Sequence, residues 1–117
     1  MSKLTIEQLQ QSTRDFAAAR DWDQFHSPKN LSMALIVEAA ELVEHFQWLT
    51  EQQSAALADD KRAEVEQELA DIFIYLVRLA DRLDIDLLSA ADAKLKTNAE
   101  KYPAEKVRGS SKKYTEY

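Results

Sequence analysis

Two pairs of acidic residues lie inside otherwise apolar stretches of the sequence. Glu38 and Glu41 are three residues apart in SMALIVEAAELVEHFQW, and Glu68 and Asp71 have the same spacing in QELADIFIYLVRLA. Residues i and i+3 of a helix lie on one face, a turn apart. The two carboxylates of each pair would therefore repel each other and would be costly to bury. A cation between the carboxylates removes both problems. Two helices that each present such a pair predict one four-carboxylate site for a hard divalent cation.

The chemistry open to such a site is phosphoryl chemistry. Mg²⁺ prefers oxygen ligands and is commonly shared between carboxylates and the phosphates of a ligand. On a polyphosphate it neutralises charge, orients the ligand and lowers the pKa of a bound water. Alternatively, the acids lie on solvated helix faces, where such pairs are common. Glu44 continues the spacing and is either a further ligand or a surface residue. Only two histidines are present, which argues against a histidine-based transition-metal site.

The elements that must position these acids are helices. The 117 residues suggest one domain, and a single glycine and two prolines leave few of the turn residues that sheets need. Apolar residues recur at helical spacing, and Thr5 with Gln8 resembles a capping box. We therefore expect an all-α helical bundle with four main helices, over residues 5–19, 31–49, 60–83 and 86–100. Residues 20–31 are expected to form a loop and 50–60 a connector.

The third predicted helix is apolar nearly all round in the stretch IFIYLV, so a small monomer would bury it poorly. This predicts a dimer or higher oligomer that completes the bundle. The net charge of −6 argues against a general nucleic-acid binder, and the lack of cysteine excludes disulfides and cysteine-ligated metals. No apolar run reaches the roughly 18 residues that span a bilayer. The N-terminal MSKLTIEQLQQ does not resemble a signal peptide, so the default expectation is a cytoplasmic location without a membrane partner.

Two further segments carry chemistry. The loop 20–31 holds Trp22, Phe25 and His26, which either fold down over the core or form an aromatic wall for a planar ligand. Residues 101–117 carry a net charge of +3, so the other 100 residues carry −9. This basic tail either folds over an anionic ligand held at the acidic site or is a solvated terminus. We therefore divide the chain into a helical domain, residues 1–102, and a basic C-terminal tail, residues 103–117.

The acidic residues also form a recognisable motif. Glu38-Ala39-Ala40-Glu41 and Glu68-Leu69-Ala70-Asp71 stand 26 residues apart. At these positions the chain resembles the MazG-like nucleoside triphosphate pyrophosphohydrolases, whose motif is written EExxE and then ExxD. Val37 stands where that motif has its first glutamate, so no role is assigned to a leading acid. The flanks RDWDQFHSPKNL, ELVEHFQW, ELADIFIYLVRLA, NAEKYP and SSKKYTE resemble the dCTP pyrophosphatase-like branch, in the same order.

This resemblance implies an all-α bundle assembled as a homo-oligomer, with a tetramer favoured over a dimer. It implies Mg²⁺-dependent hydrolysis of a (deoxy)nucleoside triphosphate, dCTP or a modified pyrimidine nucleotide, to the monophosphate and pyrophosphate, with Mn²⁺ as a possible substitute. The magnesium ligands would be Glu38, Glu41, Glu68 and Asp71, and Glu41 or Glu38 would orient or deprotonate the attacking water. The residues expected to bind the substrate are Trp22, Phe25, His26, Trp48, Tyr75, Lys94, Asn98, Tyr102, Arg108, Lys112 and Lys113.

Helical spacing is compatible with this arrangement. Tyr75 lies one turn beyond Asp71, and Lys94 and Asn98 are also one turn apart, so acids, an aromatic ring and a polar clamp can converge. Two other functions stay open at this point. The chain could be a non-catalytic helical interaction module with a solvated acidic surface. The same site could instead hydrolyse a phosphoribosyl nucleotide.

Overall fold

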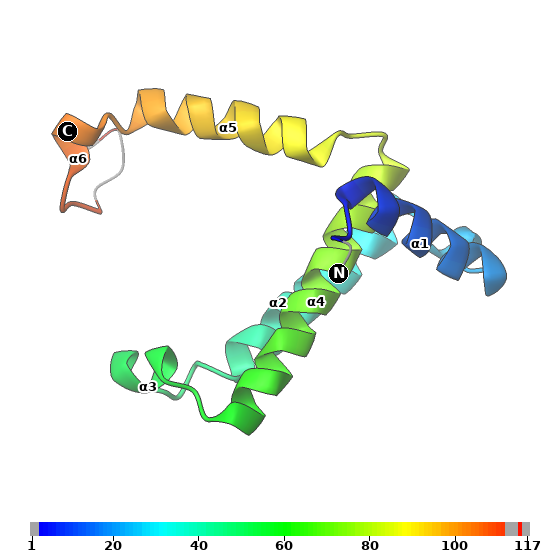
Figure 1. Cartoon of the computed structure of the whole chain (residues 1–117), viewed down its shortest axis with the longest axis horizontal. Coiled ribbons are helices and arrows are strands. Elements are labelled where there is room, and N and C mark those ends of the chain that lie inside the picture. The colour runs from blue at the N-terminus through cyan, green and yellow to red at the C-terminus, as the bar shows by residue number, and fades with distance from the viewer. Residues whose placement is uncertain (1–2, 112–114, 116–117) are drawn as a thin grey trace. The chain divides into compact units, whose positions relative to one another are not determined.

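The computed structural model describes residues 3–111 and residue 115, and these residues are helical with no β-strand (Figure 1). The elements in chain order are α1 (Ile6–Ala19), the 3₁₀ turn η1 (Asp23–Phe25), α2 (Pro28–Glu44), α3 (Glu51–Ala55), α4 (Asp59–Arg82), α5 (Leu87–Lys101) and α6 (Ala104–Val107). The predicted all-α class with four main helices is confirmed. Within the described residues, no helix is both long and apolar enough to cross a lipid bilayer.

Local sequence explains where α1 begins and ends. The Thr5 side-chain oxygen accepts a hydrogen bond from the Gln8 backbone N–H, and the Gln8 side-chain oxygen accepts one from the Thr5 backbone N–H, which is the predicted capping box. Asp21 follows the helix with a φ of +53°, a left-handed conformation that Asp tolerates better than most residues. The backbone N–H of Trp22 then bonds the Ala17 carbonyl, and that of Asp21 bonds Ala18. This Schellman arrangement directs the chain into the segment between α1 and α2, which we call the aromatic loop because it holds Trp22, Phe25 and His26.

The boundaries predicted for the second helix were wrong at both ends. Ser27 caps α2 through a hydrogen bond from the Asn30 backbone, and Pro28 occupies the first helical position, where its missing N–H costs nothing. The helix therefore begins three residues earlier than expected. It ends at Glu44 rather than at residue 49, and irregular turns follow until Thr50 caps the short helix α3 with a second capping box.

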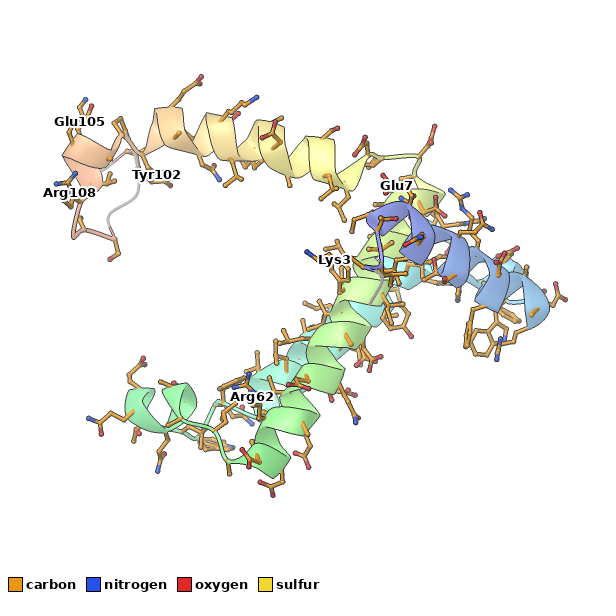
Figure 2. All side chains as sticks on the ribbon, in the orientation of Figure 1. Lys3, Glu7, Arg62, Tyr102, Glu105 and Arg108 are labelled. Atoms are coloured by element: carbon orange, nitrogen blue, oxygen red, sulfur yellow. The ribbon has the colours of Figure 1, made fainter. Side chains whose placement is uncertain are left out.

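The chain divides into two compact units, residues 1–84 and residues 85–117, and each is described by itself. In the first unit, α2 and α1 both pack against α4 (Figure 1). Five apolar residues from these three helices form its buried core: Ala17, Leu31, Val65, Val77 and Ala80. The second unit consists of α5, capped by Asp86, and α6, and neither of these helices has a buried residue. Figure 2 shows Tyr102 and Arg108 in this second unit.

Candidate active site

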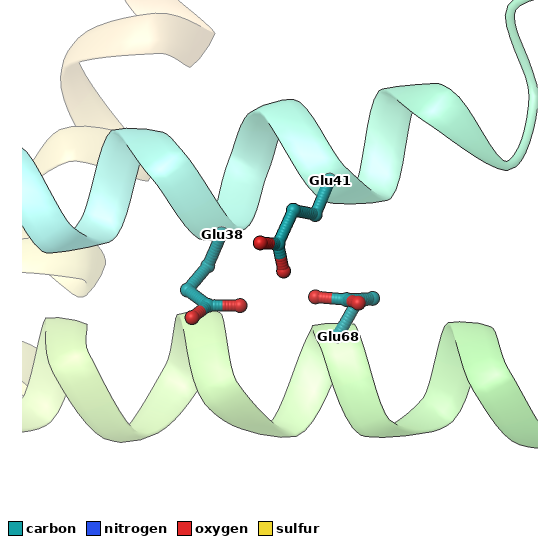
Figure 3. A group of neighbouring side chains, drawn as sticks. All are labelled: Glu38, Glu41 and Glu68. Carbon is teal, nitrogen blue, oxygen red and sulfur yellow. The ribbon is translucent and has the colours of Figure 1, made fainter.

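Three of the four predicted metal ligands come together between α2 and α4. Glu38 and Glu41 lie one turn apart on α2, and Glu68 projects toward them from α4 (Figure 3). One carboxylate oxygen from each of the three residues lies within 4.8 Å of the other two. The packing of α2 on α4 creates this cluster, because it apposes the glutamate-bearing faces of the two helices. We call Glu38, Glu41 and Glu68 the acidic cluster.

Protein groups alone do not stabilise the negative charge of the acidic cluster. One oxygen of Glu38 and one of Glu68 are buried with no hydrogen-bond partner among the described residues. Burial raises the pKa of Glu38 to about 7, helped by hydrogen bonding of its protonated form with Glu68 and Glu41 and by the charges of Glu41 and Asp71. A buried acceptor without a donor is costly, and a cation would satisfy both oxygens. The all-oxygen donor set fits Mg²⁺, which prefers carboxylates and water.

Asp71, the fourth predicted ligand, is not part of the acidic cluster. It lies one turn beyond Glu68 on α4 and lines a neighbouring pocket of about 460 Å³. Its charge nevertheless contributes to the raised pKa of Glu38, so it acts on the same region. Asp71 therefore stands between the acidic cluster and the pocket.

The pocket lies between α1, the aromatic loop and α4, and it contains three of the predicted substrate-binding residues: Trp22, His26 and Tyr75. The Trp22 ring contacts Phe16 edge-on at a centroid distance of 5.6 Å and lies 6.2 Å from the His26 ring. The aromatic loop thus both packs on α1 and walls a cavity, so its two alternative interpretations are not exclusive. We call this cavity the aromatic pocket.

The other predicted substrate-binding residues of the first unit do not line the aromatic pocket. Phe25 and Trp48 are absent from its lining, and Trp48 is 86% exposed. The remaining predicted substrate-binding residues that the structure describes belong to the second unit. Lys94 and Asn98 lie one turn apart on α5, Tyr102 follows the end of α5, and Arg108 follows α6. Lys112 and Lys113 lie outside the described residues. A role for these residues in binding substrate stays a prediction.

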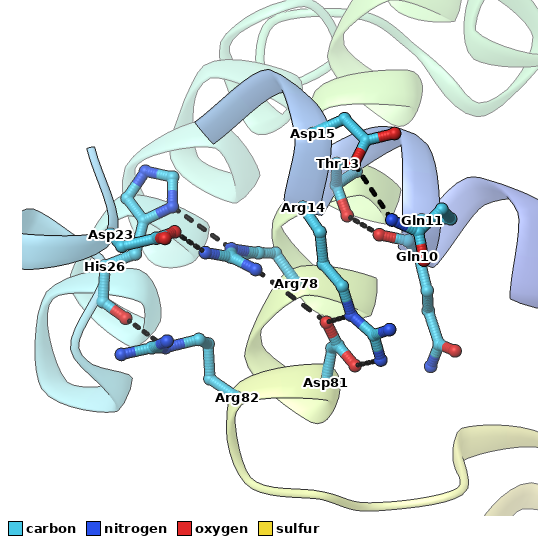
Figure 4. Close-up of polar contacts among 10 residues, drawn as sticks. All are labelled: Gln10, Gln11, Thr13, Arg14, Asp15, Asp23, His26, Arg78, Asp81 and Arg82. Atoms are coloured by element: carbon cyan, nitrogen blue, oxygen red, sulfur yellow. Dashed lines mark hydrogen bonds and ion pairs between the residues drawn. The ribbon is translucent and has the colours of Figure 1, made fainter. Parts of the chain in front are cut away.

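A network of charged residues beside the aromatic pocket was not predicted from the sequence (Figure 4). Arg78 is buried on α4, and its guanidinium donates to Asp23 at 2.6 Å and to Nδ1 of His26 at 3.2 Å. Arg14 on α1 forms a bidentate pair with Asp81, at 2.7 and 2.5 Å. The only local sign of this network is a charged residue, Arg78, inside the apolar run ELADIFIYLVRLA.

His45, just past the end of α2, is the second unpredicted neighbour of the site. Its Nε2 lies 3.9 Å from Glu68, and its Nδ1 lies 3.4 Å from the Lys61 ammonium. Lys61 in turn pairs with Glu64 at 3.0 Å. A partly buried imidazole from the C-terminal end of α2 therefore lies beside Glu68, and the Lys61 ammonium of α4 lies next to that imidazole.

Comparisons with known proteins agree with this geometry. The model of the MazG-like family matches residues 33–117. The chain is 46% identical over 114 residues to dCTP pyrophosphatase 1 of Mus musculus and 45% identical to that of Homo sapiens, covering 96% of this chain and 67% of each relative. A crystal structure of a pyrophosphatase from Archaeoglobus fulgidus superposes with a TM-score of 0.81 at 36% identity, covering 88% of this chain and 96% of that one.

The chain belongs to the MazG-like family. It is an enzyme, and its reaction class is that of the pyrophosphatases. The expectation from sequence of an all-α pyrophosphohydrolase is thereby confirmed, and the non-catalytic interaction module is set aside.

Proposed function

We propose that this nucleoside triphosphate pyrophosphatase hydrolyses dCTP or a modified pyrimidine deoxynucleotide to the monophosphate and pyrophosphate, in a reaction that depends on Mg²⁺. The observation that carries the proposal is the adjacency of two features on α4. A carboxylate cluster with two buried, unpartnered oxygens lies next to a pocket walled by an indole, an imidazole and a phenol. The first suits the metal-bound phosphates, and the second suits a base.

The metal would be held by Glu38, Glu41 and Glu68, with Asp71 at the pocket side. When bound, Mg²⁺ would neutralise the triphosphate and activate a water, and Mn²⁺ could replace it because it accepts the same oxygen ligands. Glu41 or Glu38 would orient the water that attacks the α-phosphorus or take its proton.

The nucleoside would be held in the aromatic pocket. Trp22 and Tyr75 offer ring faces for stacking on a base, and His26 adds a polar edge. From the second unit, the residues expected to contact the substrate are Lys94, Asn98, Tyr102 and Arg108, together with Lys112 and Lys113, which lie outside the described residues. Their side chains include cations and hydrogen-bond donors of the kind that bind phosphates.

We also propose that the working enzyme is a homo-oligomer, with a tetramer favoured. Large apolar side chains on the paired helices stay open to solvent, including Ile36 at 66%, Leu69 at 51% and Phe73 at 43% exposed. A second copy of the chain would cover such surface. Phe25 and Trp48, both exposed in the single chain, would then be available to a site completed by assembly. A cytoplasmic location stays a prediction.

The test is a pyrophosphate-release screen over canonical and modified deoxynucleoside triphosphates, with Mg²⁺, with Mn²⁺ and with a chelator. We expect turnover that needs the metal and is highest for dCTP or a modified pyrimidine. Asp71→Asn is the matched inactive control, because it removes a charge and keeps the side chain's shape. Phosphoribosyl-ATP belongs in the same panel. If that compound were the preferred substrate, or if no triphosphate released pyrophosphate, the proposal would be wrong.

A further inference from the structure

Arg78 is the one charged residue that is buried as a whole among the described residues, with 4% of the residue exposed. A buried guanidinium is costly unless its donors are satisfied. Here Nη2 donates to Asp23 at 2.6 Å, Nη1 lies 3.7 Å from Asp81, and Nε donates to His26 Nδ1 at 3.2 Å. Contacts on these three nitrogens fix the orientation of the guanidinium plane, so the direction of the Nε–H bond is fixed as well.

The contact with His26 determines where the imidazole carries its proton. A guanidinium has donors only, so the ring nitrogen that it faces must be an unprotonated acceptor. Nδ1 of His26 is that nitrogen, which leaves the proton of the neutral ring on Nε2. The backbone is also held, because the carbonyl oxygen of His26 accepts a hydrogen bond from Arg82 at 3.1 Å (Figure 4).

His26 and Arg78 both line the aromatic pocket. Since Nδ1 is occupied by Arg78, the ring nitrogen left for a bound molecule is Nε2, and it carries a proton. We propose that Arg78 is a positioning residue that locks His26 in its Nε2–H tautomer and so makes it a fixed hydrogen-bond donor to the nucleoside part of the substrate. A fixed donor favours a carbonyl oxygen or an unprotonated ring nitrogen and disfavours an amino group at the same place. This inference rests on the proposed nucleotide substrate.

Two substitutions separate the hydrogen bond that Arg78 donates to His26 from the charge of Arg78. In Arg78→Gln the amide nitrogen takes the position along the side chain that Nε has in arginine, so a donor to Nδ1 is retained. In Arg78→Met a methyl group takes that position, so no donor is left. Both variants lose the charge, the pair with Asp23, whose side chain is 53% exposed, and the contact with Asp81, which keeps its pair with Arg14. They are therefore matched in the ionic contacts that they lose.

The first readout is the tautomer itself, measured by two-bond ¹H–¹⁵N correlation spectra of protein labelled at histidine. The chain has two histidines, so His45→Gln assigns the signals. We expect the neutral Nε2–H form of His26 in the wild type and in Arg78→Gln, and a mixture with the Nδ1–H or charged form in Arg78→Met. A wild-type ring protonated on Nδ1, or an unchanged tautomer in Arg78→Met, would overturn the proposal.

The second readout is kinetic. Loss of a donor that binds the substrate equally in ground and transition states raises KM and leaves kcat unchanged. We expect KM for the preferred triphosphate to be about three- to tenfold higher in Arg78→Met than in Arg78→Gln, which corresponds to one ordinary hydrogen bond. Equal KM values in the two variants would contradict a role in substrate binding.

The outcomes distinguish this inference from the proposed function. If no triphosphate is hydrolysed, the proposed function fails, while the tautomer spectra still test the effect of Arg78 on His26. If Arg78→Met does not fold, scalar coupling across the hydrogen bond between Arg78 Nε and His26 Nδ1 in the wild type decides. A measurable coupling supports the proposal that Arg78 fixes the tautomer of His26. Absence of the coupling in spectra that resolve both nitrogens overturns the proposal.

Discussion

Glu38 leads to the sharpest prediction, because its protonation and the binding of a metal exclude each other. With a pKa of about 7, the Glu38 carboxyl holds a proton that a metal ligand must give up. Loading the site with Mg²⁺ should therefore release about 0.9 proton per chain at pH 6, about 0.5 at pH 7 and about 0.1 at pH 8 from this residue, because metal ligation requires the ionised form.

The assay is a calorimetric titration with MgCl₂ in buffers of different ionisation enthalpy. The slope of the observed enthalpy against the buffer enthalpy gives the number of protons released. In Glu38→Gln the titrating group is gone, so the release should fall toward zero and the affinity for Mg²⁺ should decrease. Glu44→Gln is the matched control, since Glu44 is on the same helix but is exposed and lies outside the acidic cluster. A control that behaved like Glu38→Gln would assign Glu44 a ligand role instead.

Two results would refute this reasoning. One is an equal proton release from Glu38→Gln and the wild type, and the other is a wild-type release that does not decrease from pH 6 to pH 8. Thermal unfolding measured over a range of pH in the presence of a chelator is an independent test. Because the folded pKa of Glu38 lies above its unfolded value, the metal-free protein should lose stability as the pH rises through about 7. Saturating Mg²⁺ should reverse that trend.

Three further changes test the other parts of the site. Glu41→Gln should abolish Mg²⁺-dependent pyrophosphate release with an unchanged circular-dichroism spectrum, because it removes a charged oxygen from the acidic cluster; wild-type turnover would contradict the metal assignment. Trp22→Leu should raise KM roughly ten- to a hundredfold, since base stacking contributes about 1–3 kcal/mol, and an unchanged KM would remove Trp22 from the binding site. The hydrogen bond and charge of Arg14 hold the pKa of Asp81 below its usual range, so Asp81 stabilises the fold above that range and loses this effect as the pH falls. The free energy of unfolding, measured with urea at pH 7 and at about pH 3, should decrease less in Asp81→Asn than in the wild type.

Local sequence was sufficient to predict what local physics determines. Thr5 and Gln8 form the capping box that the sequence predicted, because the hydrogen bonds involved span three residues. The same local reasoning failed at Ser27 and Pro28, which were assigned to a loop. Proline ends a helix when it lies inside one but begins a helix at the first position, and the sequence pattern did not distinguish the two cases.

The acidic cluster was predictable for a similar reason, since helical geometry places residues three apart on one face. The sequence could not show how far along α4 the cluster extends, so Asp71 was grouped with Glu68 although it lines the pocket. The network around Arg78 could not be predicted. Arg78 and His26 are 52 residues apart and Arg14 and Asp81 are 67 apart, so only the packing of α1 and the aromatic loop on α4 brings them together.

One face of α4 relates these parts to each other. Glu68, Asp71, Tyr75, Arg78 and Arg82 follow one another at steps of three or four residues, so they form a single stripe along the helix. The stripe begins with carboxylates, passes an aromatic ring and ends with two guanidinium groups that hold His26. A bound nucleotide would therefore have its metal-bound phosphates toward Glu68 and its base toward Arg78. The change of charge along α4 would favour this orientation, because the opposite one would place the metal ion beside the buried Arg78 and the exposed Arg82.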